Sequence, residues 1–167
     1  LVEERAGSVR FLERPERGGY PAAVNTGLRE AGGDVVLLNS DTEVTEGWLE
    51  KLADAAHRRL RVASATPFSN NATLCSLPRP FAENALPAGH TVASFARLVE
   101  EGSAHLAPEI PTGVGFCLYV TREALESVGP LDEEAFGAGY GEEVDWCLRA
   151  AERGFAHVLD DATFVWH

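Results

Sequence analysis

The spacing of apolar residues changes several times along the chain, and each change predicts a helix or a strand. Apolar positions that recur every three or four residues favour helices, whereas short continuous apolar runs favour buried strands. The expected helices cover residues 21–30, 45–60, 91–101, 122–127 and 141–153. The expected strands cover residues 9–12, 34–38, 61–66, 113–120, 155–159 and 162–165. Strands that alternate with helices indicate an α/β domain with a mixed, mostly parallel sheet.

One long segment, residues 67–89, shows neither pattern. It contains four prolines and the polar run Ser69-Asn70-Asn71. Loops of this length are uncommon in compact domains unless they carry a function. No linker, repeat or low-complexity tract divides the chain, and its 167 residues suit one domain covering residues 1–167.

The charge balance and the cysteines limit the classes of function. Twenty-six acidic residues against 14 Lys and Arg leave a net charge of −12. Such a chain lacks the basic surface that nucleic-acid backbones require, so we expect no nucleic-acid partner. No apolar run approaches the roughly 20 residues of a membrane-spanning helix. The three cysteines form no CxxC pattern, which favours reduced thiols in a cytosol-like compartment.

The first candidate site is Asn39-Ser40-Asp41, directly after the expected strand 34–38. In open α/β sheets, ligands bind beyond the carboxyl ends of the strands. Asp41 could therefore present a carboxylate to Mg²⁺ or Mn²⁺, which prefer hard oxygen ligands. A turn in which these side chains bond their own backbone explains the same residues, so both interpretations stay open.

Two further candidate sites lie near the end of the chain. Glu142, Glu143 and Asp145 open the expected helix 141–153, and their mutual repulsion would favour a general base. Acidic residues in a first turn also simply complement the helix dipole. His167 follows an apolar strand and could supply a nitrogen ligand, although terminal residues are often frayed.

The order of these motifs resembles that of a known family. The motifs are Asn39-Ser40-Asp41-Thr42-Glu43, Gly113-Val114-Gly115-Phe116-Cys117-Leu118, Gly141-Glu142-Glu143-Val144-Asp145-Trp146 and Trp166-His167. In this order they resemble family 2 glycosyltransferases of the GT-A fold, particularly the bacterial rhamnosyl- and galactofuranosyl-transferase-like members. The resemblance runs from about Gly18 to His167. It implies a GT-A fold for the domain.

One part of the family pattern is missing. Family members begin with a strand-helix-strand unit that holds the nucleotide base, and this chain starts after that unit. We therefore expect an N-terminally truncated domain, the central and C-terminal part of a GT-A domain. The sheet edge left exposed would favour self-association.

The resemblance also implies roles for individual residues. Asp41 and His167 would bind Mg²⁺ or Mn²⁺, and Glu143 would be the catalytic base. The acceptor or donor pocket would contain Asn39, Gly113, Gly115, Glu142, Asp145 and Trp146. The segment 67–89 would lie near the acceptor.

The implied activity is an inverting, metal-dependent transfer of a sugar from a nucleotide-diphosphate donor to a hydroxyl of a glycan or lipid-linked acceptor. Such transfers belong to cell-surface polysaccharide or glycan synthesis, in the cytoplasm or at the inner face of the membrane. Two other classes stay open. The chain could be a non-catalytic carbohydrate- or partner-binding module of the same fold, or a metal-dependent hydrolase on an α/β sheet.

Overall fold

The computed structural model describes residues 10–14 and 18–167. Its helices are α1 (Gly19–Glu30), α2 (Trp48–His57), α3 (Val92–Gly102), α4 (Arg122–Val128), α5 (Glu133–Phe136) and α6 (Glu142–Glu152), with a short 3₁₀ turn η2 at Thr73–Cys75. Its strands are β1 (Val35–Leu38), β2 (Val62–Phe68), β3 (Glu109–Ile110), β4 (Cys117–Val120) and β5 (Ala156–Phe164). The five helices expected from periodicity are confirmed. The expected strand 9–12 is not, since residues 10–12 form no strand and Val9 lies outside the described residues.

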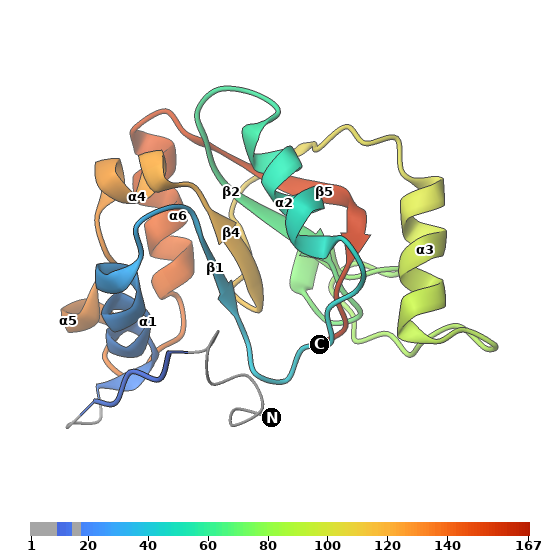
Figure 1. The fold of residues 1–167 in the computed structure, drawn as a ribbon, viewed down its shortest axis with the longest axis horizontal. Helices are drawn as coiled ribbons and strands as arrows, with labels where there is room; N and C mark the ends of the chain where they lie inside the picture. The colour runs from blue at the N-terminus through green and yellow to red at the C-terminus, as the bar shows by residue number, and fades with distance from the viewer. Residues whose placement is uncertain (1–9, 15–17) are drawn as a thin grey trace.

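The strands form one mixed sheet in the order β1-β4-β2-β5-β3. Strand β4 lies antiparallel between β1 and β2, whereas β2 and β5 pair in parallel. The mixed sheet is confirmed, but within the described residues only the β2–β5 pairing is parallel. Because β1, β2 and β5 run in the same direction, their carboxyl ends share one edge with the amino end of β4. In Figure 1 the arrows of β1 and β5 point toward this edge.

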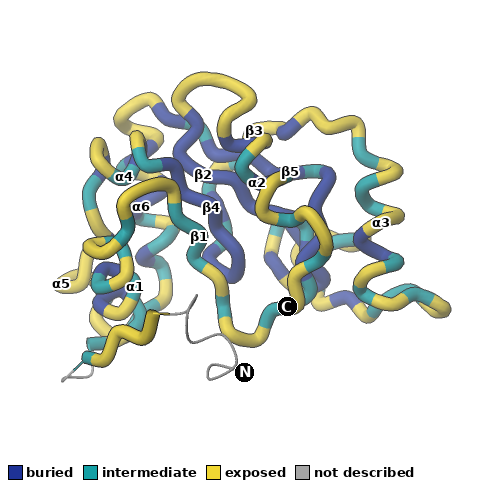
Figure 2. The backbone as a smooth tube through the Cα atoms, viewed as in Figure 1, coloured by how far each residue is buried: buried dark blue, intermediate teal, exposed yellow. Residues whose placement is uncertain are grey.

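The sheet is buried between helices, and β4 shows why. Cys117 and Tyr119 on β4 pack with Leu52 of α2, whereas Leu118 and Val120 pack with residues of α4 and α6. This alternation buries both faces of the strand. Figure 1 shows α1, α4, α5 and α6 gathered on the left, with α2 and α3 on the right. Figure 2 shows β2, β4 and β5 as mostly buried, whereas β1 at the end of the sheet is mostly intermediate.

Some predicted boundaries are wrong, for local reasons. The segment expected to be two strands is one continuous strand, β5. Asp160, which lies in the expected gap between the two strands, points its side chain inward and is only 3% exposed. Its carboxylate accepts a hydrogen bond from the N–H of Ala162. The register of β2 against β5 shifts at this point. Thr45 does not cap α2, since its hydroxyl donates to the carbonyl of Phe164 and Gly47 occupies the cap position.

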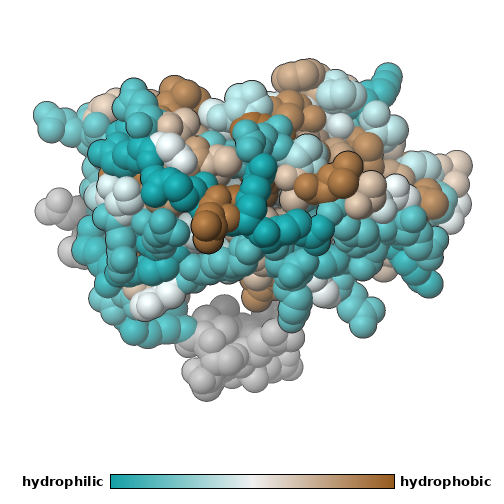
Figure 3. All heavy atoms as spheres, turned by 90° about the horizontal axis from the view of Figure 1, so that it is seen from above, coloured by the Kyte–Doolittle hydropathy of each residue, from teal (hydrophilic) through white to brown (hydrophobic). Residues whose placement is uncertain are grey.

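Figure 3 shows apolar side chains scattered among hydrophilic ones on one face of the molecule, as is usual for globular domains. In the described parts of the chain, no helix is both long and apolar enough to cross a bilayer. Strand β1 lies at one end of the sheet and, as far as the structure describes the chain, pairs only with β4.

Candidate active site

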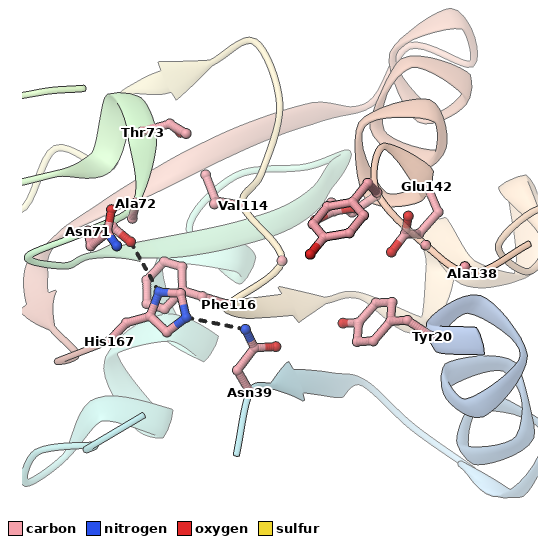
Figure 4. Close-up of a pocket in the computed structure, with 14 residues that line it drawn as sticks. Tyr20, Asn39, Asn71, Ala72, Thr73, Val114, Phe116, Ala138, Glu142 and His167 are labelled. Carbon is pink, nitrogen blue, oxygen red and sulfur yellow. Dashed lines mark hydrogen bonds between the residues drawn. The ribbon is translucent and has the colours of Figure 1, made fainter. Parts of the chain in front are cut away.

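A cavity of about 480 Å³ opens at the edge where β1, β2 and β5 end. Its volume lies within the range of about 300–1,000 Å³ that is typical of small-molecule sites. It is lined by Tyr20, Asn39, Asn71, Ala72, Thr73, Val114, Gly115, Phe116, Ala138, Gly139, Tyr140, Glu142, Glu143 and His167. In Figure 4, Asn39 and His167 lie on one side of this cavity, while Glu142 and Tyr20 lie on the other.

The side of the cavity with Asn39 joins the ends of β1 and β5. The backbone of Glu43 exchanges hydrogen bonds of 2.9 and 3.0 Å with that of Trp166. This pairing brings Oδ1 of Asp41 to 3.7 Å from Nε2 of His167. The structure therefore brings together the two residues that the sequence singled out as metal ligands.

The orientation of His167 is set by residues of the 67–89 segment. The side-chain amide of Asn70 accepts a 2.8 Å bond from the backbone N–H of His167 and donates a 2.6 Å bond to its carbonyl. Ring Nδ1 lies 3.1 Å from the carbonyl of Asn71, and the ring stacks on Phe116 with centroids 5.2 Å apart. A proton on Nδ1, donated to this carbonyl, leaves a lone pair on Nε2. In this structure the lone pair faces the side-chain amide of Asn39, 3.3 Å away, which a ligand would have to displace.

The Asp41–His167 pair fits a hard divalent cation in part. Neighbouring ligand atoms of an octahedral cation with bonds of about 2.1 Å lie about 3 Å apart. The 3.7 Å separation is longer, so the exposed side chain of Asp41 would have to move closer to Nε2 of His167 for both atoms to bind one cation. Within residues 10–14 and 18–167, no group of three or more His, Cys, Asp or Glu side chains could hold a metal ion. The remaining ligands would therefore come from water or from a bound phosphate, as is common for Mg²⁺ sites.

The first motif does form a turn at Ser40 and Asp41, but the side chain that bonds the backbone of this turn is that of Thr42, not one of the three side chains that the turn interpretation named. The hydroxyl of Thr42 donates a 2.8 Å hydrogen bond to the carbonyl of Asn39, as in a hydroxyl-stabilised turn. The side chain of Asn39 instead points to the imidazole, with Nδ2 at 3.3 Å from Nε2 of His167. Asp41 has a side chain that is 76% exposed, so its carboxylate is accessible to a ligand.

The opposite side of the cavity is acidic. Glu142 and Glu143 lie in the first turn of α6, and each has a buried Oε2 atom without a hydrogen-bond partner among the described residues. Glu142 is 3% exposed, and burial, followed by the charge of Glu143, raises the pKa of its carboxyl. Buried carboxylate oxygens are normally hydrogen-bonded, so these two atoms are suited to accept a proton or a hydrogen bond from a ligand.

Tyr20, in the first turn of α1, also faces these carboxylates. Burial, then the charges of Glu143 and Glu142, raise the pKa of Tyr20 to about 12. Its hydroxyl therefore stays protonated at neutral pH and can donate a hydrogen bond. The sequence carries no periodic or motif signal for this residue. Asn71, in contrast, follows β2, so the strand-end rule that indicated Asn39 could also have indicated Asn71.

Three predicted pocket residues do not line the cavity. Trp146 is 2% exposed in the core, and its Nε1 donates to the carbonyl of Gly129. Asp145 forms a 2.8 Å ion pair with Arg149. Gly113 is covered, because a Cβ atom there would lie 2.3 Å from Leu118. Helical spacing alone does not separate the first two from the acidic pair, since Asp145 and Trp146 follow Glu142 by three and four residues on the same side of α6. Glu142 and Glu143 line the cavity because they lie at the amino end of the helix, one turn before Asp145 and Trp146.

Comparison with protein families gives one match. A family described as "Glycosyl transferase family 2" matches residues 1–129. These residues include the Asn39–Asp41 motif and Gly113–Cys117 but not Glu143 or His167. A comparison with curated protein sequences finds no match.

Solved structures match over the full fold. GalNAc-T7 with UDP, GalNAc and Mn²⁺ superposes with a TM-score of 0.72 at 14% identity, over 99% of this chain and 33% of that one. The mannosyltransferase PcManGT from Pyrobaculum calidifontis, in complex with GDP-Man and Mn²⁺, has a TM-score of 0.63 at 19% identity, over 99% and 41%. The chain thus spans less than half the length of either protein. The similarity establishes that the fold is the GT-A fold.

Proposed function

The chain belongs to glycosyl transferase family 2, and we propose that it is an inverting, metal-dependent glycosyltransferase. It would move a hexosyl or deoxyhexosyl group from a nucleotide-diphosphate sugar to an acceptor hydroxyl. One observation carries the proposal. A single cavity is lined by Glu143, whose Oε2 atom has no hydrogen-bond partner among the described residues, and by Asn39 and His167.

Glu143 would be the base. Its carboxylate accepts the proton of the acceptor hydroxyl, and the hydroxyl oxygen forms a bond to the anomeric carbon of the donor. The bond between that carbon and the diphosphate oxygen breaks on the opposite face, and its electron pair leaves with the diphosphate. The sugar is therefore transferred with inversion. A base needs hydrogen-bond reach to the proton that it removes. Two observations support Glu143 in this role: it lines the cavity, and its Oε2 atom has no hydrogen-bond partner among the described residues.

The protonated Tyr20 hydroxyl and Glu142 would support this base. Burial and the charge of Glu143 raise the pKa of Glu142, so a proton on Glu142 would limit its repulsion with the carboxylate of Glu143. Tyr20 can donate a hydrogen bond to the pair or to a sugar hydroxyl. Both residues orient the reacting groups without taking part in bond formation.

Asp41 and His167 would hold the divalent cation, Mg²⁺ or Mn²⁺, next to the donor diphosphate. A cation there would neutralise negative charge on the leaving group. Asn39 would bind the ribose or the diphosphate. The mixed carboxylate and imidazole pair favours Mn²⁺ over Mg²⁺, because imidazole suits transition metals better than it suits magnesium.

The biological setting is also part of the proposal. Following the resemblance to bacterial rhamnosyl- and galactofuranosyl-transferases, the acceptor would be a glycan or a lipid-linked sugar of cell-surface polysaccharide synthesis. All three cysteines are buried free thiols, which supports a reducing cytoplasm, including the inner face of the membrane, as the place of action.

The test is turnover with a panel of UDP-, GDP- and dTDP-sugars in Mn²⁺, measured as nucleoside diphosphate release, with the product anomer assigned by NMR. We expect an inverted product, and Glu143→Gln should lower kcat at least about a hundredfold, the usual scale for a general base. Glu134→Gln is the control, because Glu134 is exposed and lies outside the cavity. A retained anomer, or full activity of Glu143→Gln, contradicts the proposal. Saturable sugar binding without turnover would favour the non-catalytic binding module.

A further inference from the structure

Tyr140 has a side chain whose exposure the fold does not explain. It is 98% exposed and lines the cavity. Its φ is 75°, in the left-handed region, between Gly139 and Gly141 with φ of 126° and 101°. Asn, Asp or Gly adopt this conformation more readily than Tyr does. Neither burial of the ring nor the backbone preference of tyrosine explains a large aromatic side chain at this position. A contact between the ring and a ligand would explain it.

The backbone that carries this ring is held on both sides. The N–H of Gly139 donates a 2.7 Å bond to the carbonyl of Phe136, and the carbonyl of Gly141 accepts a 2.9 Å bond from Asp145. The N–H of Tyr20 donates to the carbonyl of Ala138. The ring therefore projects from a fixed turn rather than from a free loop, which lowers the entropy that a ligand must offset on binding.

The position of Tyr140 in the cavity decides which ligand it meets. It comes three residues before Glu143 and two before Glu142, which lies on the side of the cavity opposite Asn39 and His167. If the diphosphate binds near His167, the group that gives its proton to Glu143 must approach from the side of α6. The ring of Tyr140 then flanks the acceptor rather than the leaving group.

We propose that Tyr140 is an acceptor-binding residue that stacks on the apolar face of a pyranose ring. This inference rests on the proposed function and deepens it, because it specifies that the acceptor is itself a sugar. One hydroxyl of that sugar would receive the transferred group. One face of a pyranose ring carries C–H groups, which suit the negatively charged face of an aromatic ring. The remaining sugar hydroxyls would meet Glu142, Tyr20 and Thr73, which line the same cavity.

A binding experiment tests this without turnover. The chain has three tyrosines, so 3-fluorotyrosine labelling gives three ¹⁹F resonances, and Tyr140→Phe assigns that of Tyr140. Methyl α- and β-pyranosides of glucose, galactose, mannose and rhamnose are titrated with and without UDP and Mn²⁺. Sorbitol is the control, since it has the hydroxyls but no ring face. Tyr119, 6% exposed, is the internal reference.

We expect a saturable shift of the Tyr140 resonance with at least one pyranoside and none with sorbitol. Absence of a Tyr140 shift with every pyranoside, or an equal shift with sorbitol, overturns the inference. Failure of UDP and Mn²⁺ to bind would instead count against the proposed function. The titrations without UDP test pyranoside binding by itself, so failure of the Tyr140 inference can be told apart from failure of the proposed function.

Kinetics on the active protein give the second readout. Tyr140→Ala should raise the acceptor KM about tenfold, the size of one aromatic contact, with a smaller effect on the donor KM. Tyr140→Phe and Tyr140→Trp keep a stacking face and should stay within about threefold of the wild type. The matched control is His105→Ala, because His105 is also an exposed ring-bearing residue with a positive φ, 51°, but does not line the cavity. An acceptor KM that responds equally to Tyr140→Ala and His105→Ala contradicts the proposal.

Discussion

A methyl group on the α-carbon of Gly115 would lie 2.5 Å from Oε1 of Glu143 and 3.1 Å from its carboxyl carbon. The carboxylate thus occupies the space that any other residue at position 115 would fill. The backbone φ of Gly115 is not in the left-handed region, so the requirement for glycine here is steric. The sequence of one loop therefore sets the position of an acid on a helix that follows it by nearly thirty residues.

Gly115→Ala should lower kcat about a hundredfold, because a displacement of a catalytic group by about 1 Å has effects of this size. Folding should change little, since the carboxylate can move into the cavity. The control is Gly27→Ala in α1, where a Cβ would meet no atom within 4 Å. Steady-state kinetics with urea unfolding of both variants check this. Equal kcat values for the two variants would contradict the steric role of Gly115.

Asp41→Ala should abolish the nucleotide-dependent binding of Mn²⁺, and His167→Ala should weaken it less, because a carboxylate contributes more than a neutral ligand to a hard cation. Calorimetric titration of Mn²⁺ in the presence of UDP measures both. Asp54→Ala is the matched control, since its side chain is 75% exposed against 76% for Asp41. Unchanged Mn²⁺ affinity in Asp41→Ala would remove this pair as the metal site.

Stability should fall in mild acid because of a buried histidine. Ring Nδ1 of His157 lies 2.8 Å from the hydroxyl of Ser64, and Nε2 lies 2.9 Å from the carbonyl of Cys147. Burial lowers the pKa of His157 below its ordinary 6.5. The unfolded chain takes up a proton near pH 6.5 while the folded ring stays neutral. The free energy of unfolding therefore decreases as pH falls below about 6.5, by at most about 1.4 kcal/mol per pH unit.

Two carboxyls act in the opposite direction. Burial raises the pKa of Glu142 and of Asp160, so the folded chain binds these protons at higher pH than the unfolded chain does. They add stability as pH falls. Urea unfolding of the wild type and of His157→Gln between pH 7.5 and about 5 isolates the histidine, and we expect a smaller loss in the variant. Identical pH slopes would contradict a neutral His157 in the folded state.

Trp146 should contribute to stability rather than to acceptor binding. Trp146→Ala removes a ring that is 2% exposed and should lower the free energy of unfolding by about 3–5 kcal/mol. Trp146→Phe keeps most of the volume but loses the hydrogen bond to Gly129, which costs about 1 kcal/mol. Urea unfolding measures both variants. A raised acceptor KM with unchanged stability in Trp146→Phe would contradict this assignment.

The helices could be predicted because local periodicity decides them. Helix α3 shows this, since Thr91 and Ser94 form a reciprocal cap and Phe95 and Ala96 face the core. Short elements could not be predicted in the same way. Strand β3 has two residues and α5 has four, so each covers about one period of its pattern and neither is long enough to repeat it. Their existence depends on pairing with β5 and on the cap that Asp132 provides.

The residues of the candidate site differ in the same way: local sequence patterns indicate some of them, and only tertiary packing brings the others to the cavity. Asn39 follows β1, and the strand-end rule indicated it, whereas only the family resemblance implied that His167 would lie at the same site. Tyr20 reaches the cavity only because α1 packs against the turn at Ala138, where the N–H of Tyr20 donates its bond. Such contacts depend on how distant elements pack. The burial of Trp146 was missed for the related reason that a sequence motif does not say which face of a helix is covered.

The pairing of β2 with β5, which aligns Val62 with Ala156, has a consequence for folding kinetics. The cavity takes residues from Tyr20 at one end to His167 at the other, and His167 reaches Asn70 only once β5 has joined the sheet. Contacts between segments so far apart in sequence form slowly, because large loops must close first. We therefore expect ligand binding to be regained in the last phase of refolding, later than the helical signal in circular dichroism.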